Sequence, residues 1–301
     1  MHSLLYALIT VFGWGTWLAP SQKVDFPNQQ IRTLYVVAAN LGIATVIALW
    51  QGPLGQEGVW DLTAATFWLT FLGGVIWAVG GLCAFTATNK LGMAKAFGIW
   101  APLNIIVSLI WGAVLFDEFV HLRAGTMLVL IAAIFMILAG VLMIIFAKGA
   151  DENGQAQGAF RLGLAGAVGA GVLWGSYFIP VKYSGVSPWA GAFPAALGMA
   201  GGGVILALLG RQSWRLASSG DYVRACLTGV LWSVGNYGML LLVAAIGAGK
   251  GFTISQTSVV IGALISIYWL HEPPPKTRAA RLTFTGCVLA TLGGIVLGNL
   301  K

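Results

Sequence analysis

Residues 14–20 read WGTWLAP, and residues 174–180 read WGSYFIP. A second pair of stretches follows in the same order, since residues 74–80 read GVIWAVG and residues 229–235 read GVLWSVG. The glycines and most aromatic positions coincide within each pair, so one apolar unit occurs twice in the chain. Internal repeats of this kind are typical of secondary transporters. The repeat therefore predicts a membrane carrier built from two related halves.

The composition excludes a soluble globular domain. Apolar residues make up 58% of the 301 residues and charged residues only 8%, whereas globular proteins carry about 25% charged residues. The 42 glycines suit close packing of helices in lipid, and the 13 tryptophans suit membrane interfaces or a pocket that stacks on flat ligands. The net charge of +7 comes from basic residues between apolar spans, so it indicates membrane orientation and not a nucleic-acid partner.

The three cysteines give no sign of a disulfide or a metal site. Cys83, Cys226 and Cys287 lie inside apolar spans without metal-ligand spacing. We interpret them as small apolar fillers and expect no cofactor. The N-terminal residues include neither a basic region nor a small-residue cleavage site, so we expect the first span to begin close to Met1.

Ten apolar stretches are long enough to cross a bilayer, which requires about 20 residues per helix. They cover residues 3–21, 33–50, 66–88, 96–116, 124–147, 162–181, 189–210, 222–245, 251–270 and 282–300. Their continuous apolarity favours helices over barrel strands. A polar linker at 148–160 separates residues 1–147 from residues 161–301, with five spans in each half. Since five is odd, the second half enters from the opposite side, so we predict an all-α polytopic membrane protein with ten transmembrane helices as two inverted five-helix repeats.

Basic residues predict the orientation of these repeats. The loops after spans 1, 3, 5, 7 and 9 carry twelve lysines and arginines, against four in the remaining loops and the C-terminal tail. The positive-inside rule places the odd-numbered loops in the cytoplasm and both termini on the non-cytoplasmic side. We therefore expect an integral protein of a bacterial inner membrane, surrounded by the lipid bilayer.

Lys95 and Lys250 stand at the head of equivalent spans, the fourth and the ninth. A helix N-terminus presents free N–H groups and a partial positive charge, so a lysine there could help to bind an anion or the hydroxyls of a polar solute. The alternative is that each lysine reaches from its helix end to the lipid headgroups.

The acidic residues lie at the ends of those same two spans. Asp117 and Glu118 close the fourth span and Glu272 closes the ninth, with His121 and His271 nearby. A proton-coupled carrier needs an ionisable group that substrate or solvent can reach, and the sequence places none at the middle of a span. The alternative is that these acids and histidines are solvated helix caps or form salt bridges beside a gate. The sequence therefore leaves coupling to protons open.

Aromatic and neutral polar residues gather in the middle of equivalent spans. We predict that substrate is bound by these side chains together with the two lysines: Trp14, Trp17, Trp77, Lys95, Trp100, Asn104, Trp174, Tyr177, Trp232, Asn236, Lys250 and Gln256. Hydroxyls at similar positions belong to Thr16, Ser108, Ser176, Ser233, Ser255, Thr257 and Ser258. Hydrogen bonding between helices explains any one of these polar groups by itself. Amides and hydroxyls beside flat rings in both halves are, however, what binding a sugar requires.

At these residues the chain resembles the drug/metabolite transporter superfamily, and within it the branch of glucose/ribose uptake and L-rhamnose transporters. The resemblance implies ten helices in two inverted halves, with a central cavity lined mainly by helices 1, 3, 4, 6, 8 and 9. The branch carries a small residue, apolar positions, and then proline and a basic residue, as in residues 15–23 and 175–182. Gly81 departs from the pattern, because an asparagine like Asn236 would be expected there.

We therefore predict a secondary transporter and not an enzyme, since the sequence contains no nucleophile with a base, no central pair of carboxylates and no metal-ligand cluster. Its expected substrate is a small polar metabolite, above all a monosaccharide, carried by alternating access. An exporter of amino acids or other small metabolites is the alternative, and a charged cavity would favour it. A non-transporting scaffold or partner-dependent subunit is a further alternative. Ten helices form a complete unit of two halves, so a monomer suffices and a dimer is compatible with the sequence.

Overall fold

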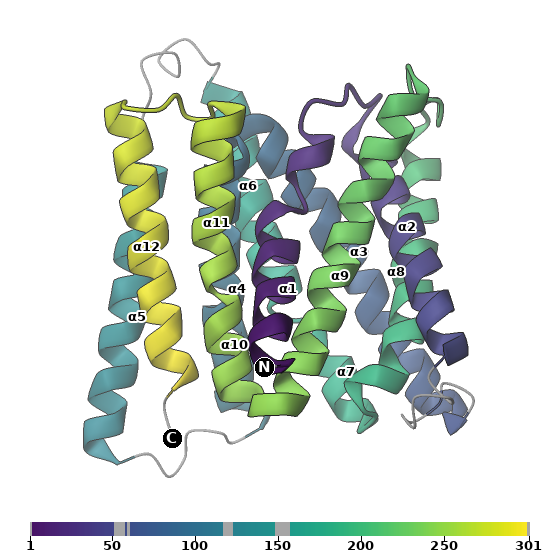
Figure 1. Ribbon diagram of the computed structural model, residues 1–301, viewed down its shortest axis with the longest axis horizontal. Coiled ribbons are helices and arrows are strands. Elements are labelled where there is room, and N and C mark those ends of the chain that lie inside the picture. Colours follow the sequence, from purple (N-terminus) through teal and green to yellow (C-terminus); the bar gives the residue numbers. More distant parts are fainter. Residues whose placement is uncertain (1, 51–57, 59–60, 117–122, 148–156, 300–301) are drawn as a thin grey trace.

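The computed structural model describes residues 2–50, 58, 61–116, 123–147 and 157–299 (Figure 1). The described chain is helical almost throughout and contains no strand. Ten of its segments are long and apolar enough to cross a membrane, which confirms the predicted all-α architecture with ten spans. The elements are α1 (His2–Thr16), η1 (Ala19–Ser21), α2 (Gln29–Trp50), α3 (Ala64–Leu91), α4 (Met93–Leu115), α5 (Ala124–Ile145), α6 (Gln157–Trp174), α7 (Phe178–Ser184), α8 (Pro188–Gly210), α9 (Ser219–Ile246), α10 (Ala248–Ser255), α11 (Thr257–Ile265), η4 (Ser266–Leu270) and α12 (Arg278–Gly298).

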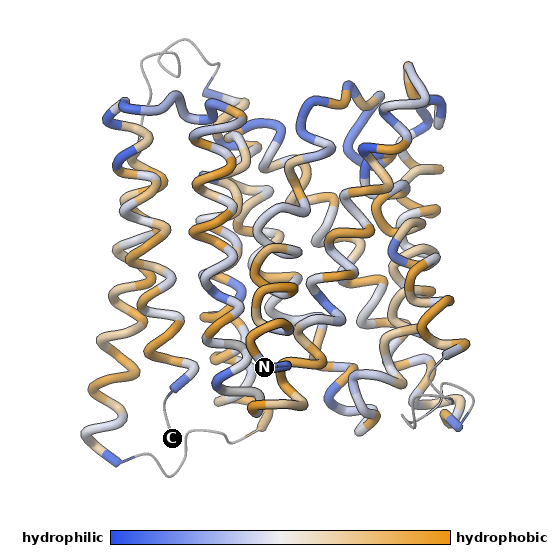
Figure 2. The backbone as a smooth tube through the Cα atoms, in the orientation of Figure 1, coloured by the Kyte–Doolittle hydropathy of each residue, from blue (hydrophilic) through white to orange (hydrophobic). Residues whose placement is uncertain are grey.

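The helices stand side by side and cross the molecule in alternating directions (Figure 1). We call the end at which α3 ends and α4 begins the upper face, and the end at which α1 begins and α12 ends the lower face. The hydropathy of the backbone changes along this axis: apolar residues cover the middle of the bundle, and hydrophilic residues are densest at the upper face (Figure 2). This is the distribution expected of a protein whose middle lies in hydrocarbon.

Glycines bring the helices into direct backbone contact. A Cβ on Gly74 of α3 would overlap the carbonyl oxygen of Ala195 in α8. A Cβ on Gly13 of α1 would lie only 2.7 Å from the Cα atom of Gly235 in α9. Lipid tails are as apolar as the side chains, so van der Waals contact at such close crossings replaces the hydrophobic drive of a soluble core.

The first, sixth and ninth spans are interrupted instead of continuous. In the first and sixth spans a proline lies shortly after the interruption: Pro20 is in η1, which follows α1, and Pro180 is in α7, which follows α6. Proline cannot donate a backbone hydrogen bond, so the helix restarts there. In the ninth span α10 and α11 meet at Gln256, where the Thr257 hydroxyl donates to the carbonyl of Ile254 at 2.7 Å and satisfies one of the carbonyls at the break.

Candidate binding cavity

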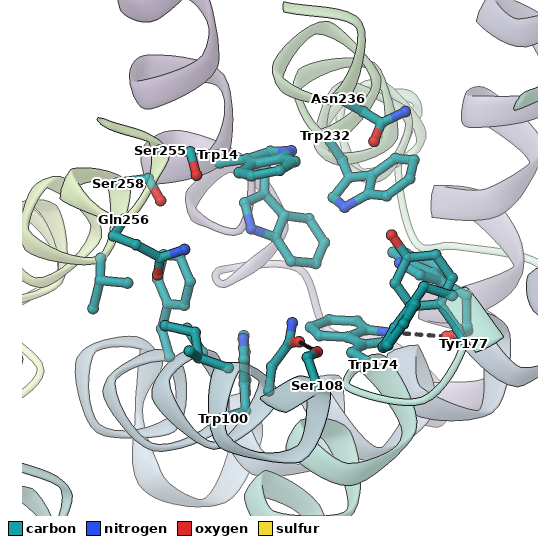
Figure 3. A pocket seen from close by; sticks show the side chains of 18 of the residues that line it. Trp14, Trp100, Ser108, Trp174, Tyr177, Trp232, Asn236, Ser255, Gln256 and Ser258 are labelled. Atoms are coloured by element: carbon teal, nitrogen blue, oxygen red, sulfur yellow. Dashed lines mark hydrogen bonds between the residues drawn. The ribbon is translucent and has the colours of Figure 1, made fainter. Parts of the chain in front are cut away.

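A cavity of about 590 Å³ lies at the centre of the bundle, between α1, α3, α4, α6, α9, α10 and α11 (Figure 3). The breaks in the sixth and ninth spans border it, since Tyr177 and Gln256 both stand at a break and both line the cavity. Ten of the twelve predicted binding residues line this one space: Trp14, Trp17, Trp77, Trp100, Asn104, Trp174, Tyr177, Trp232, Asn236 and Gln256. The tertiary structure thus brings together residues from both halves of the chain.

The two predicted lysines stay outside this cavity. Lys95 is 3% exposed and lies in the first turn of α4, at the upper face. Lys250 is exposed near the start of α10, at the lower face, where it lines a separate hollow with Thr253 and Asn299. The two side chains therefore lie at opposite ends of the bundle, because α4 and α10 begin at opposite faces (Figure 1).

The acidic residues do not reach the cavity lining either. Glu272 and His271 lie in the turn after η4 at the upper face, and both are exposed. Asp117, Glu118 and His121 lie outside the described residues. The described lining consists of aromatic, aliphatic and neutral polar side chains and carries no formal charge.

Trp174 is the centre of an aromatic wall. Its ring stacks on Trp77 with centroids 5.2 Å apart and meets Trp100 edge-on at 5.5 Å. Its indole N–H donates to the main-chain carbonyl of Trp77 at 3.0 Å, and the ring centroids of Trp77 and Trp232 lie 4.6 Å apart. Gly80 makes this packing possible, since a Cβ there would lie 2.6 Å from the Trp174 ring. The result is a continuous aromatic surface with fixed ring orientations.

Neutral polar groups lie around the rest of the cavity. On α4 the Ser108 hydroxyl lies 3.3 Å from both the Asn104 side-chain oxygen and the main-chain carbonyl of Gly175, and each can accept its proton. Further polar side chains, drawn in Figure 3, come from α9 and from the α10–α11 break: Asn236, Ser255, Gln256 and Ser258. Together these groups can both donate to and accept from the hydroxyls of a bound solute.

Several other hydroxyls at this depth bond to the protein itself. Thr16 donates to the carbonyl of Phe12 at 2.6 Å, and Ser233 on α9 donates to the Asn40 side chain on α2 at 2.7 Å. Ser176 accepts a 2.8 Å hydrogen bond from the indole of Trp111. Ser233 and Ser176 thus show the hydrogen bonding between helices that was the alternative for these residues, whereas the Thr16 hydroxyl bonds within its own helix.

The apolar part of the lining was not predicted. It comprises Phe97, Ala101, Ile105, Leu109, Phe178 and Val259. Four of these lie on α4 at helical spacing around Trp100 and Asn104, because residues three or four apart share a helix face. Once Trp100 and Asn104 are assigned to the cavity, the spacing of three residues identifies Phe97 and Ala101, whereas Ile105 lies at this spacing from neither of them.

Comparisons with known proteins identify the family of this chain. The sequence profile of the sugar transport protein family matches residues 5–300. A protein of Enterococcus faecalis that is provisionally named a sugar uptake protein is 28% identical, over 99% of both chains. A protein of Bacillus cereus with the same provisional name is 27% identical, again over 99% of both chains.

Two further comparisons extend this result. A Priestia megaterium protein that is provisionally named a glucose uptake protein is 26% identical over 79% of this chain and 81% of its own. A solved crystal structure covers 99% of both chains with a TM-score of 0.65, and its 12% identity supports the fold alone. The predicted resemblance is therefore confirmed: this integral membrane protein belongs to the sugar transport protein family, a family of the glucose/ribose-uptake type within the drug/metabolite transporter superfamily.

Proposed function

We propose that the protein carries a neutral monosaccharide across a bacterial inner membrane by alternating access. The observation that carries this proposal is the uncharged central cavity, in which aromatic rings face amides and hydroxyls. A sugar ring offers C–H groups on its faces and hydroxyls around its edge. It can therefore stack on tryptophan while its edge forms hydrogen bonds, and no counter-charge is needed.

The proposed site consists of the ten cavity residues that the sequence predicted. The rings of Trp77, Trp174 and Trp232 form the stacking surface, and the amides of Asn104, Asn236 and Gln256 pair with hydroxyls of the sugar. Each hydrogen bond contributes roughly 0.5–1.5 kcal/mol net, because the sugar exchanges water for protein. Several such bonds give the modest affinity that a carrier needs in order to release its substrate.

An exporter of amino acids is less well supported by this cavity. A zwitterion or anion that enters a low-dielectric site needs opposite charges or many hydrogen bonds, since leaving water costs it several kcal/mol. Lys95 and Lys250 could supply positive charge, but both lie away from the cavity at the two faces. The same reasoning favours unphosphorylated sugars over sugar phosphates.

The alternating-access part of the proposal rests on a repeated pattern of helix contacts. In this pattern α1, α2, α3 and α4 of the first half correspond to α6, α8, α9 and α11 of the second. The contact between α3 and α6 then matches that between α9 and α1, the contact between α3 and α8 matches that between α9 and α2, and the contact between α4 and α6 matches that between α11 and α1. Gly92 and Gly247, which precede α4 and α10, share a positive φ, at 78° and 86°. We therefore propose two inverted repeats, residues 1–147 and 161–301, joined by the linker 148–160.

Orientation follows from charge. Described basic residues are concentrated at the upper face, among them Arg211, Arg215, Arg278 and Arg281 (Figure 2). By the positive-inside rule we place the upper face in the cytoplasm and the two termini outside. Since one chain encloses the whole described cavity, we propose the monomer as the transporting unit.

The test is uptake of radiolabelled glucose, ribose, rhamnose, glucose 6-phosphate and several amino acids into liposomes that contain the purified protein. Saturable uptake of a neutral sugar, with none of the phosphate ester, is the expected result. Transport of amino acids without sugar would overturn the proposal. An imposed pH gradient separates the two modes of coupling: a proton symporter accumulates sugar against its gradient, whereas a facilitator only equilibrates it.

A further inference from the structure

The first two turns of α4, at the upper face, are packed inside the protein, whereas the lower end of this helix is exposed. On α4 the residues from Met93 to Trp100 are all buried, whatever side of the helix they occupy. At the other end of the same helix Ala113, Val114 and Leu115 are exposed. From this burial we infer that protein covers the cavity at its upper end in this conformation, and transport by alternating access requires that this end opens.

Arg32 is buried in the sealed region. It lies in the first turn of α2 and is 2% exposed. Its guanidinium donates to the Ser21 hydroxyl at 3.0 and 3.2 Å and to the Thr88 hydroxyl at 3.2 Å, and it lies over the Phe85 ring at 4.5 Å. One side chain thus joins η1, α2 and α3.

The partners of this guanidinium make the contact reversible. Among the described residues its hydrogen-bond acceptors are neutral hydroxyls and not carboxylates. A buried cation without a bonded anion recovers only part of the hydration that it lost. The cation–π contact with Phe85 offsets a further part. Arg32 therefore holds the three elements together while they are closed, and it regains water when they separate.

A second set of contacts joins the two halves at the same face. The N–H of Ala94 at the start of α4 donates to the Ser266 hydroxyl of η4 at 2.9 Å. That hydroxyl in turn donates to the main-chain carbonyl of Glu272 at 2.6 Å, and the Glu272 side chain accepts from the N–H of Met93. Free N–H groups at a helix start favour an acidic cap. Glu272 also lies within electrostatic range of Arg32.

We propose that these two sets of contacts form the gate of the upper face, with Arg32 as its central residue and Glu272 and Ser266 as the cap that holds α4 closed. This inference rests on the proposed alternating access. When the gate opens, the start of α4 leaves Ser266 and Glu272, and Arg32 leaves Ser21 and Thr88 for water. None of these residues lines the cavity, so they govern access and do not bind the sugar.

The gate is tested by the access of a thiol reagent from each side. Ala101 lines the cavity and is small, so Ala101→Cys is made in a chain whose three native cysteines are replaced by alanine. A charged, membrane-impermeant methanethiosulfonate is applied to right-side-out and to inside-out vesicles. The measured quantity is the ratio of the upper-face to the lower-face reaction rate.

We expect Arg32→Gln to raise this ratio at least fivefold, Arg32→Lys to give an intermediate value, and Ser21→Ala and Ser266→Ala to raise it by smaller factors. Arg161→Gln is the matched control, since Arg161 is an exposed arginine of the same face, and it should leave the ratio unchanged. If Arg32→Gln does not accumulate in the membrane, Ser21→Ala and Ser266→Ala decide the test. Folded variants with an unchanged ratio would overturn the gate, even if their melting temperatures fall.

The outcome separates the gate from the proposed substrate. A chain that transports neutral sugar but whose ratio does not respond to these changes retains the proposed function and refutes the gate. A ratio that responds in a chain without sugar uptake supports the gate and refutes the sugar proposal.

Discussion

Trp174 connects the packing of the helices with the chemistry of the cavity. Its ring forms the centre of the aromatic wall, and its N–H bonds to a main-chain carbonyl of a different helix. The position of the ring depends on the absence of a side chain at Gly80. A single atom added to α3 therefore affects both stability and the proposed stacking surface.

The first prediction concerns Gly80→Ala. The new methyl group would lie 2.6 Å from the Trp174 ring, so the ring or the helix must shift. Overpacking of this kind costs typically about 1–3 kcal/mol, and we expect a lower melting temperature in detergent together with weaker sugar uptake. Gly42→Ala is the control, because a Cβ there meets nothing within 4 Å. An equal loss of stability in both variants would contradict this account of Gly80.

The second prediction concerns Asn104→Ala. Loss of one amide removes a hydrogen bond to the sugar, worth about 1 kcal/mol, which corresponds to roughly a fivefold rise in KM for uptake. Lys250→Gln should leave KM unchanged, since Lys250 lies at the lower face outside the cavity. Initial rates of uptake into liposomes over a range of sugar concentrations give both values. A larger rise in KM for Lys250→Gln than for Asn104→Ala would contradict the proposed position of the substrate in the central cavity.

At the scale of elements, the start of α4 and the turn after η4 form one unit across the two halves. Although Glu272 is exposed overall, desolvation of its carboxylate raises its pKa above the ordinary value; the N–H of Met93 and the charges of Lys23 and Arg32 act in the opposite direction. A carboxyl group with a raised pKa binds its proton more tightly in this closed form than in a hydrated, open form. Acid therefore favours the closed gate, and a rising pH favours its opening.

The third prediction follows from that sign. The rate ratio for Ala101→Cys should increase as the pH at the upper face rises above the ordinary glutamate pKa of about 4.3. Because the ratio compares the same thiol from two sides, changes in thiol ionisation cancel. In Glu272→Gln, which cannot titrate, the dependence should disappear. A pH dependence that persists in this variant would assign the titration to another group.

At the scale of the whole molecule, the distribution of basic residues predicts which face meets the cytoplasm. Ser213 is exposed at the upper face and Ala64 is exposed at the lower face. In the cysteine-free chain, Ser213→Cys should react with an impermeant thiol reagent in inside-out vesicles, and Ala64→Cys in right-side-out vesicles. The reverse pattern would place the termini in the cytoplasm and the proposed gate on the non-cytoplasmic side.

Much of the membrane architecture could be predicted from the sequence. The ten spans follow from the length and continuous apolarity of each stretch, and ten of the twelve predicted binding residues, chosen by their depth and their recurrence in both halves, line the cavity. Depth is readable because a polar amide such as Asn104 or Gln256 is costly in hydrocarbon unless it has a partner. The interruptions of the first, sixth and ninth spans were not predicted: Pro20 and Pro180 lie shortly after two of them, and the interruption at Gln256 has no proline beside it.

By itself, the sequence determined the class of protein, the number of spans and the residues available at mid-depth. Only the tertiary structure decided which of them meet: it separated Lys95 and Lys250 from the cavity, turned the Ser233 hydroxyl toward Asn40, and buried Arg32 against Ser21 and Thr88. The physical reason is that lipid and protein interior are equally apolar. A helix in this setting lacks the polar face that reveals its orientation in a soluble protein, so only its contacts with distant helices determine which side chains reach the cavity.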